Sequence, residues 1–291
     1  MDIISHFDLR YIGNESNIID ITNKKYDNVV PGLDKFLLAY NVCSTVEDIY
    51  MYPEWFILEN GYYYFKSGDS FNELLMAELF KEFKLKCLDY RIAQYGNKVG
   101  ILSKNFRKRE TRYYEYNMYP DESGLLSYST LNDFEKYVSK FINSDNLISL
   151  IASLSRLLVA DFFSGQSDRL SYNLLLEERS ELKLAPISDN GAIFKIDEMN
   201  VSRSCIETLR FPSEKVVDAV EYNTLKLIVE NSEFRNYLIK CLDIDINEII
   251  NRTIDKYYLK LYKYERKEIV SYFDTKKSII ENTLKLVKKE N

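Results

Sequence analysis

The order of the secondary-structure signals along the chain constrains its fold more than any other feature of the sequence. Residues 54–104 carry two β-prone runs, one helical pattern and two more β-prone runs, whereas the residues after 145 are mainly helical apart from one short hairpin. Strands and helices segregated in this way predict an α+β protein. We therefore expect a small mixed β-sheet part with one helix and a larger, mainly helical part, with the boundary near Asn105.

Turn and capping signals delimit the small part. Asn60-Gly61 lies between the first two β-prone runs, and Asn-Gly is the strongest short-range signal for a β-hairpin. Gly96-Asn97 separates the second two runs. Between the hairpins, Ser70 and Glu73 have the spacing of a capping box, which predicts that a helix begins there. The four expected strands span Glu54–Leu58, Tyr62–Lys66, Tyr90–Tyr95 and Lys98–Lys104.

One apolar helix is expected at the centre of the larger part. Leu147–Phe163 is the most apolar stretch, but it is short for a membrane span and contains Arg156 and Asp161, so we predict a buried helix. Residues 105–145 are expected to be a polar connector, and residues 1–50 have no clear pattern. The remaining elements are expected at Leu174–Glu178 and Leu182–Ile187 (a hairpin), Ser213–Glu230, Ser232–Leu242, Ile246–Tyr262 and Lys263–Lys289.

The composition argues against several kinds of site. The formal net charge is −6, with 39 Lys and Arg against 45 Asp and Glu, so we expect no direct nucleic-acid binding. His6 is the single histidine, and a Ser-His-Asp triad or a multi-histidine metal site would depend on it. The four cysteines form no C-x-x-C motif, and charged residues interrupt any N-terminal signal sequence. These features predict a cytoplasmic protein with no membrane association.

The first residues with a chemical interpretation are Lys66, at the end of an expected strand, and Glu73, in the helix that follows. A lysine oriented by a glutamate can contact two phosphates of a nucleotide as a point charge. Lys and Glu are abundant in this chain, so the alternative is a solvated ion pair worth less than about 1 kcal/mol.

A second pair, Asp168 and Asn173, lies in a polar loop after the apolar helix. A loop aspartate can accept the proton of an attacking hydroxyl, and an asparagine five positions later can offer its carbonyl oxygen to Mg²⁺. Both residue types also form turns, which is the alternative interpretation.

The third element is Asp189-Asn190-Gly191, after the expected hairpin. Its carboxylate could bridge Mg²⁺ and nucleotide phosphates, and its glycine would allow an unusual backbone angle. A plain turn is again the alternative. The three elements nevertheless follow one another in the order, and on the kinds of structure, that a protein-kinase-like site requires. This agreement favours the functional interpretation.

The chain resembles the HipA-like serine/threonine kinases, and more closely the compact CtkA-type bacterial kinases in that group. The resemblance covers roughly residues 55–195 and rests on four stretches: YYYFKSG…FNELLMAELFKEFKL, VGILSKNF, LLVADFFSGQSDRLSYNLLLEE and LKLAPISDNGAIF. The chain departs from the family pattern at Leu170, where a histidine is common, and at Ser167. It also has no clear glycine-rich loop before Lys66.

The resemblance implies a two-lobed protein-kinase-like fold. Residues 1–104 would form a β-rich nucleotide-binding lobe, and residues 105–291 a helical catalytic lobe. Backbone in the segment around Ser103, Lys104 and Phe106 would meet the adenine in the cleft between the lobes.

The resemblance also implies roles for single residues. Lys66, oriented by Glu73, would bind the ATP phosphates; Asp168 would be the catalytic base; Asn173 and Asp189 would hold Mg²⁺. The implied reaction is transfer of the ATP γ-phosphate to a serine or threonine of a protein, with autophosphorylation.

The same resemblance implies a biological setting, and alternatives stay open beside it. The protein would be a toxin paired with an antitoxin or DNA-binding partner protein, or an effector delivered to a host cell. A small-molecule or lipid kinase could use the same catalytic groups, and a nucleotide-binding pseudokinase could retain them without turnover. The sequence indicates neither the substrate nor the oligomeric state.

Overall fold

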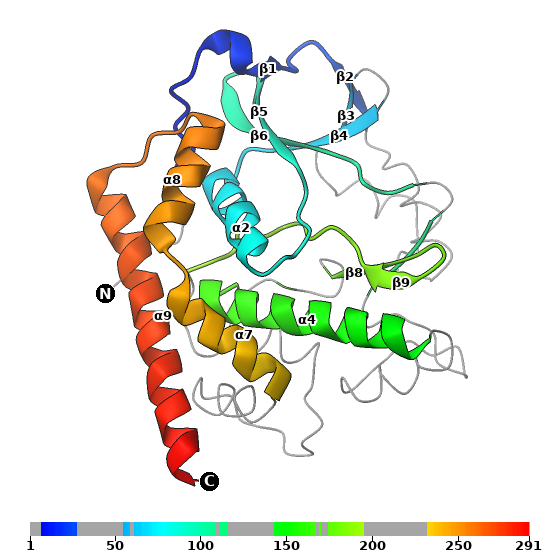
Figure 1. Cartoon of the computed structure of the whole chain (residues 1–291). Coiled ribbons are helices and arrows are strands. Elements are labelled where there is room, and N and C mark those ends of the chain that lie inside the picture. Colours follow the sequence, from blue (N-terminus) through cyan, green and yellow to red (C-terminus); the bar gives the residue numbers. More distant parts are fainter. Residues whose placement is uncertain are drawn as a thin grey trace.

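The structure, a computed structural model of the chain, describes residues 7–27, 55–58, 61–108, 111–115, 143–166, 169, 174–194 and 232–290 (Figure 1). These residues form a six-stranded sheet with one helix packed on it, and a larger part of four helices and a three-stranded sheet. The predicted α+β organisation is confirmed. The helix predicted at Ser213–Glu230 lies outside the described residues.

The six-stranded sheet has the order β1-β5-β6-β4-β3-β2. Its strands are β1 (Ile19–Asp20), β2 (Lys25–Asp27), β3 (Trp55–Leu58), β4 (Gly61–Lys66), β5 (Tyr90–Tyr95) and β6 (Lys98–Lys104), and a short 3₁₀ helix, η1 (Glu15–Asn17), precedes β1. The two hairpins β3–β4 and β5–β6 confirm the turn predictions. β1 and β2 lie where the sequence has no clear pattern, and β1 pairs with β5 in parallel.

Side chains alternate between the two faces of β4, as in any strand. Tyr63 and Phe65 are buried on one face, against Phe56 and Leu102. Lys66 points to the other face, where helix α2 (Ser70–Glu82) packs and supplies a partner for its ammonium. The alternation therefore turns the lysine at the end of the strand toward the helix.

Helix α2 begins where it was predicted, but the capping box does not form. The Ser70 hydroxyl donates to the carbonyl of Lys66 at 2.9 Å, and the Glu73 carboxylate is bound by Lys66 instead of reaching back to the helix start. The cap position is Asp69, with φ 52° in the left-handed region. The prediction was wrong because the glutamate is committed to a tertiary partner.

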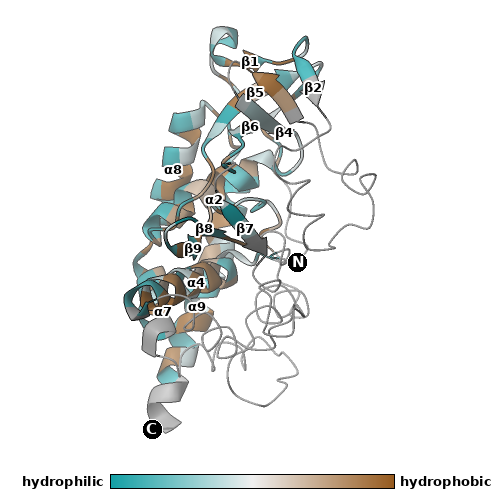
Figure 2. Ribbon diagram, turned by 90° about the vertical axis from the view of Figure 1, so that its right-hand side faces the viewer, coloured by the Kyte–Doolittle hydropathy of each residue, from teal (hydrophilic) through white to brown (hydrophobic). Residues whose placement is uncertain are grey.

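The larger part is built around α4 (Ser144–Ser164), and its other helices are α7 (Ser232–Asp243), α8 (Ile246–Tyr257) and α9 (Lys263–Glu290). Among the described residues, α4 is long and apolar enough to cross a membrane, yet 67% of its apolar window is buried inside the protein. Figure 2 shows its hydrophobic colouring beside α7 and α9. This agrees with the predicted buried helix.

Three features of the larger part differ from the prediction. Helix α8 ends at Tyr257 because Tyr258 adopts a left-handed conformation, with φ 53°. The expected polar connector contains a strand, β7 (Arg112–Glu115), which pairs with β8 (Leu175–Glu178) in the sheet order β7-β8-β9. The third strand, β9 (Leu182–Leu184), ends before Pro186, which has no N–H to donate.

A single hydrophobic cluster connects the two parts of the protein. It draws members from α2 and all four helices of the larger part, among them Leu75, Phe80, Leu158, Ile250 and Phe273. The N-terminal segment joins it, because Phe7 packs edge-on against Phe71 and Arg10 binds Glu265 of α9 at 2.8 Å. Helix α2 is thus fixed between the small sheet and the helical part.

Candidate active site

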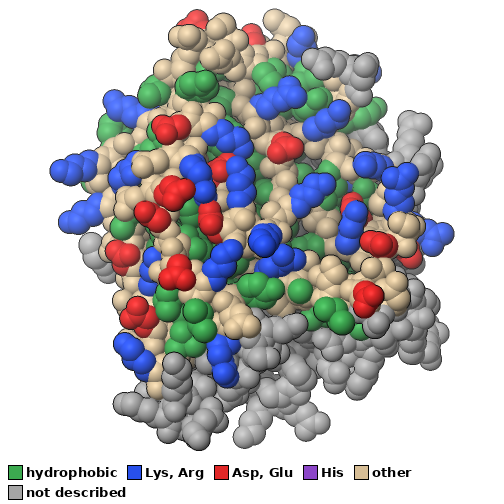
Figure 3. All heavy atoms as spheres, viewed as in Figure 1, with side chains coloured by type: hydrophobic (Ala, Val, Ile, Leu, Met, Phe, Trp, Pro, Cys, Tyr) green, Lys and Arg blue, Asp and Glu red, His purple; other side chains and the backbone are tan. Residues whose placement is uncertain are grey.

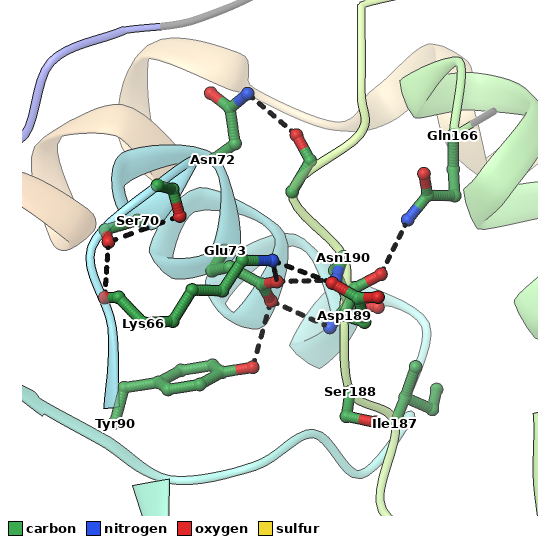
Figure 4. A network of polar contacts seen from close by, with 12 residues as sticks. Lys66, Ser70, Asn72, Glu73, Tyr90, Gln166, Ile187, Ser188, Asp189 and Asn190 are labelled. Atoms are coloured by element: carbon green, nitrogen blue, oxygen red, sulfur yellow. Dashed lines mark hydrogen bonds and ion pairs between the residues drawn. The ribbon is translucent and has the colours of Figure 1, made fainter. Parts of the chain in front are cut away.

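Three of the residues selected from the sequence meet at one point. The Lys66 ammonium lies 2.7 Å from Glu73 Oε1 and 2.7 Å from Asp189 Oδ1 (Figure 4). The lysine comes from the end of β4, the glutamate from the first turn of α2, and the aspartate from the loop after β9. Residues 123 positions apart in the chain are therefore in direct contact.

The three charges differ in how far they are removed from water. The side chain of Glu73 is 1% exposed, that of Lys66 19% and that of Asp189 43%. Burial alone would lower the pKa of Lys66, but the charges of Glu73 and Asp189 outweigh it and raise that pKa above its ordinary value. The ammonium therefore stays charged at neutral pH, and the Asp189 carboxylate keeps a face toward solvent.

Two residues to which the sequence assigned no role of their own, Tyr90 and Asn190, hold the buried Glu73 carboxylate. The Tyr90 hydroxyl donates to Oε2 at 3.0 Å, and the backbone N–H of Asn190 donates to Oε1 at 2.9 Å. Burial and the nearby Glu73 charge raise the pKa of Tyr90, which keeps its hydroxyl a donor. Glu73 is thus positioned from three sides to orient Lys66.

The loop of Asp189-Asn190-Gly191 is fitted closely to the small lobe. A Cβ atom at Gly191 would lie 2.5 Å from Cβ of Asp69, so only glycine allows this approach. The residue with the unusual backbone angle is Asp189, with φ 54°. The predicted reason for the glycine was therefore wrong: space rather than a special angle requires it. Asn72 and Gln166 also bind the loop, by donating to the carbonyls of Gly191 and Asp189 at 2.9 and 3.1 Å.

A buried ion pair next to this loop was also missed from the sequence. Arg169 is 1% exposed and its guanidinium binds both carboxylate oxygens of Asp161, at 2.9 and 3.0 Å. The same guanidinium donates to the carbonyl of Ser188 at 3.0 Å and to Asn190 Oδ1 at 2.7 Å. An acidic residue inside an apolar helix was the available signal, because a buried carboxylate needs a cationic partner.

Two predicted residues, Asp168 and Asn173, lie outside the described residues. Their roles stay predictions. Arg169, directly after Asp168 in the sequence, is described and is anchored beside the loop of Asp189.

The segment predicted to meet adenine joins the two parts of the protein. Ser103 is 3% exposed and pairs with Tyr64 on the same sheet face as Lys66. Lys104 points to the opposite face, where its ammonium lies 6.0 Å from the centre of the Tyr63 ring. Phe106 packs on the cluster of Tyr113, Leu175 and Ala185 in the larger part. The backbone here borders both lobes, whereas the Lys104 side chain faces away from Lys66.

Asp189 is a described residue that could serve as a ligand of a magnesium ion shared with phosphates. Among the described residues, no group of three or more His, Cys, Asp or Glu side chains could hold a metal. Mg²⁺ in nucleotide sites takes one or two carboxylates and completes its shell with phosphates and water. Asp189, partly exposed beside Lys66, fits one such ligand.

No family model matches the sequence, and no curated protein sequence matches it. The structure of the chain, however, matches a solved structure. The crystal structure of CtkA, a proinflammatory kinase of Helicobacter pylori, matches with a TM-score of 0.63 and 18% identity, over 94% of this chain and 98% of that chain. The chain has a CtkA-like kinase fold. The predicted two-lobed, kinase-like fold is thereby confirmed.

A second solved structure matches less well. It is the complex of HipA and HipB of Shewanella oneidensis MR-1 with operator DNA, which matches with a TM-score of 0.45 and 12% identity, over 79% of this chain and 57% of that chain.

Proposed function

We propose that this CtkA-like protein is an ATP- and Mg²⁺-dependent serine/threonine protein kinase that also phosphorylates itself. The observation that carries the proposal is the position of Lys66 between Glu73 and Asp189 in a kinase-like fold. In phosphoryl transfer, this lysine–glutamate pair and a metal-binding aspartate must be in place together.

Lys66 would neutralise charge on the ATP phosphates. Its ammonium is held on the buried side by Glu73. Asp189 lies on the solvent-exposed side, from which phosphates and metal would approach. Since Glu73 is fully buried and hydrogen-bonded, it orients the lysine without being reached by the nucleotide. The segment from Ser103 to Phe106 would contact the adenine through its backbone.

Asp189 and Asn173 would hold Mg²⁺, which supplies charge neutralisation on the β- and γ-phosphates when bound. Asp168 would take the proton of the substrate hydroxyl while the oxygen of that hydroxyl forms a bond to the γ-phosphorus. The bond between that phosphorus and the β-γ bridging oxygen breaks, and ADP leaves with the electron pair.

The replacement Asp168→Asn tests the proposed base. We expect autophosphorylation with labelled ATP and Mg²⁺ to fall by about 100-fold or more, because the amide cannot accept the proton. Asp255→Asn, on the exposed face of α8, is the control and should retain activity. Undiminished phosphorylation by the Asp168 variant would refute this assignment.

The same assay separates the alternatives. Labelled product on a lipid or small molecule, with none on protein, would favour a lipid or small-molecule kinase. Binding of ATP and Mg²⁺ without any labelled product would favour a pseudokinase.

The biological setting is part of the proposal. The first setting is a cytoplasmic protein that is delivered to a host cell as an effector; the matched structure is described as a proinflammatory kinase. A toxin controlled by an antitoxin is the second setting, and mapping the phosphorylated proteins in host and bacterial extracts would distinguish the two.

A further inference from the structure

The inference starts from Asn190, which is completely buried next to Asp189. Its side-chain oxygen accepts a hydrogen bond from Arg169 at 2.7 Å. Its side-chain nitrogen faces Glu73 Oε2 at 3.4 Å, and its backbone N–H donates to Glu73 Oε1 at 2.9 Å. One amide therefore stands between a buried cation and a buried anion.

The chemistry of this position requires an amide. An asparagine can accept a bond from a guanidinium and donate one to a carboxylate at the same time. An aspartate here would keep the bond to Arg169 but would place a second carboxylate opposite Glu73. An apolar residue of similar size would satisfy neither charged group.

Arg169 extends the contact to the helical part of the protein. Its guanidinium is paired with Asp161 of α4 through two bonds, and it also fixes the carbonyl of Ser188. The planar guanidinium makes these bonds in a fixed fork, which a lysine cannot reproduce. Arg169 thus ties the segment before Asp189 to helix α4.

We infer that Asn190 and Arg169 are positioning residues that link the loop of the proposed base to the Lys66–Glu73 pair. The link runs from Asp161 through Arg169 and Asn190 to Glu73. It rests on the proposed function only in assigning Asp168, the neighbour of Arg169, as the base. The link keeps the loop of the proposed base in a fixed position relative to the Lys66–Glu73 pair. Neither Asn190 nor Arg169 would contact the reacting atoms, so both are positioning residues.

The replacements Asn190→Asp and Arg169→Lys break the link at opposite ends. Asn190→Asp keeps the acceptor for Arg169 and the backbone N–H bond to Glu73, but it replaces the side-chain donor to Glu73 with a second carboxylate. Arg169→Lys keeps a positive charge near Asp161 but loses the two-pronged guanidinium. The matched control is Asn251→Asp on the surface of α8, where the asparagine oxygen also accepts from an arginine, Arg266, at 2.7 Å.

Each variant is assayed at a temperature at which circular dichroism shows it folded. We expect kcat to fall by about tenfold or more and the Mg²⁺ concentration for half-maximal rate to rise by a similar factor, because misplaced groups lose much of their effect. The control should match the wild type. A purely structural role would lower the melting temperature and leave both kinetic values of the folded enzyme unchanged, and this result would overturn the inference.

A second readout does not depend on turnover. Binding of a non-hydrolysable ATP analogue is titrated with and without Mg²⁺, and we expect the two variants to lose most of the gain in affinity that Mg²⁺ gives the wild type. Wild-type protein that binds the analogue but phosphorylates nothing would refute the proposed kinase activity, and the titration would still decide the inference. Variants with an undiminished Mg²⁺ effect would overturn it.

Discussion

The two ends of helix α2 are both held by charged side chains, but the cationic partners differ in their exposure to solvent. In its first turn, Glu73 is buried and binds Lys66, Tyr90 and Asn190. Toward its last turn, Glu78 and Glu82 bind side chains of α8, Lys256 at 3.0 Å and Arg252 at 2.6 Å. At this outer end the Glu78 carboxylate is buried too, but its partner Lys256 is 46% exposed and Arg252 is 36% exposed.

This difference in exposure suggests different roles for the two ends: the inner ion pair positions Lys66, and the outer pairs attach α2 to α8. Breaking a buried, fully bonded ion pair leaves an uncompensated charge and costs about 3–5 kcal/mol, whereas an exposed pair contributes about 1 kcal/mol or less. Figure 3 shows acidic and basic side chains intermixed on the face that carries α8 and α9, where water and salt weaken each pair. We therefore expect the buried end of α2 to determine chemistry and the outer end to contribute modest stability.

The largest effect is expected for Glu73→Gln, which breaks the buried end. The lysine then has only Asp189 as a charged partner in this network, and the free energy of unfolding should fall by about 3 kcal/mol. Phosphotransfer per folded molecule should fall by about 100-fold, since Lys66 is no longer oriented. Urea denaturation and the autophosphorylation assay measure the two effects. Glu82→Gln, at the outer end, is the control. Equal losses of stability and activity in both variants would show that the two ends of α2 do not differ in function.

A smaller, pH-dependent effect is expected for Glu78→Gln. Burial would raise the pKa of Glu78, but hydrogen bonds from Lys81 and Lys256 outweigh it, so the pKa is lowered. A carboxyl with a lowered folded pKa contributes stability above its unfolded pKa and loses that stability as the pH falls through the folded value. The variant should be less stable than wild type by about 1 kcal/mol at pH 7. The difference in unfolding free energy should shrink as the pH falls below about 4.3, the ordinary pKa of a glutamate. A difference that stays constant down to acid pH would show that the ionised carboxylate is not the source.

The smallest effect is expected for Arg252→Ala at the outer end. Its side chain is 36% exposed and pairs with Glu82 and Glu248, so the loss of stability should be below about 1 kcal/mol and smaller still at high salt. Kinase activity should be unchanged. Urea denaturation at low and high salt checks the first expectation. A marked loss of activity would contradict the expectation, because it would show that the contact with α8 also positions α2 for catalysis.

The local pattern of the sequence was sufficient for most of the regular structure described here. Strands β3 to β6, helix α2 and helix α4 follow from alternation, helical periodicity and turn residues, because each signal acts over a few neighbours. The order of Lys66, Glu73 and Asp189 along these elements also indicated that they would meet, and they do. Asp168 and Asn173, which complete the proposed site, lie outside the described residues and stay predictions.

Only the tertiary structure decided which groups surround those charges. Tyr90, Asn190 and Arg169 have no local signal that marks them as partners of Glu73 or Asp161, because their bonds depend on how distant segments pack. The capping box failed for the same reason, since Glu73 binds the ammonium of Lys66 and not its own helix end. A short sequence motif determines which chemistry a residue can offer, and burial beside a particular partner determines which of its bonds is made.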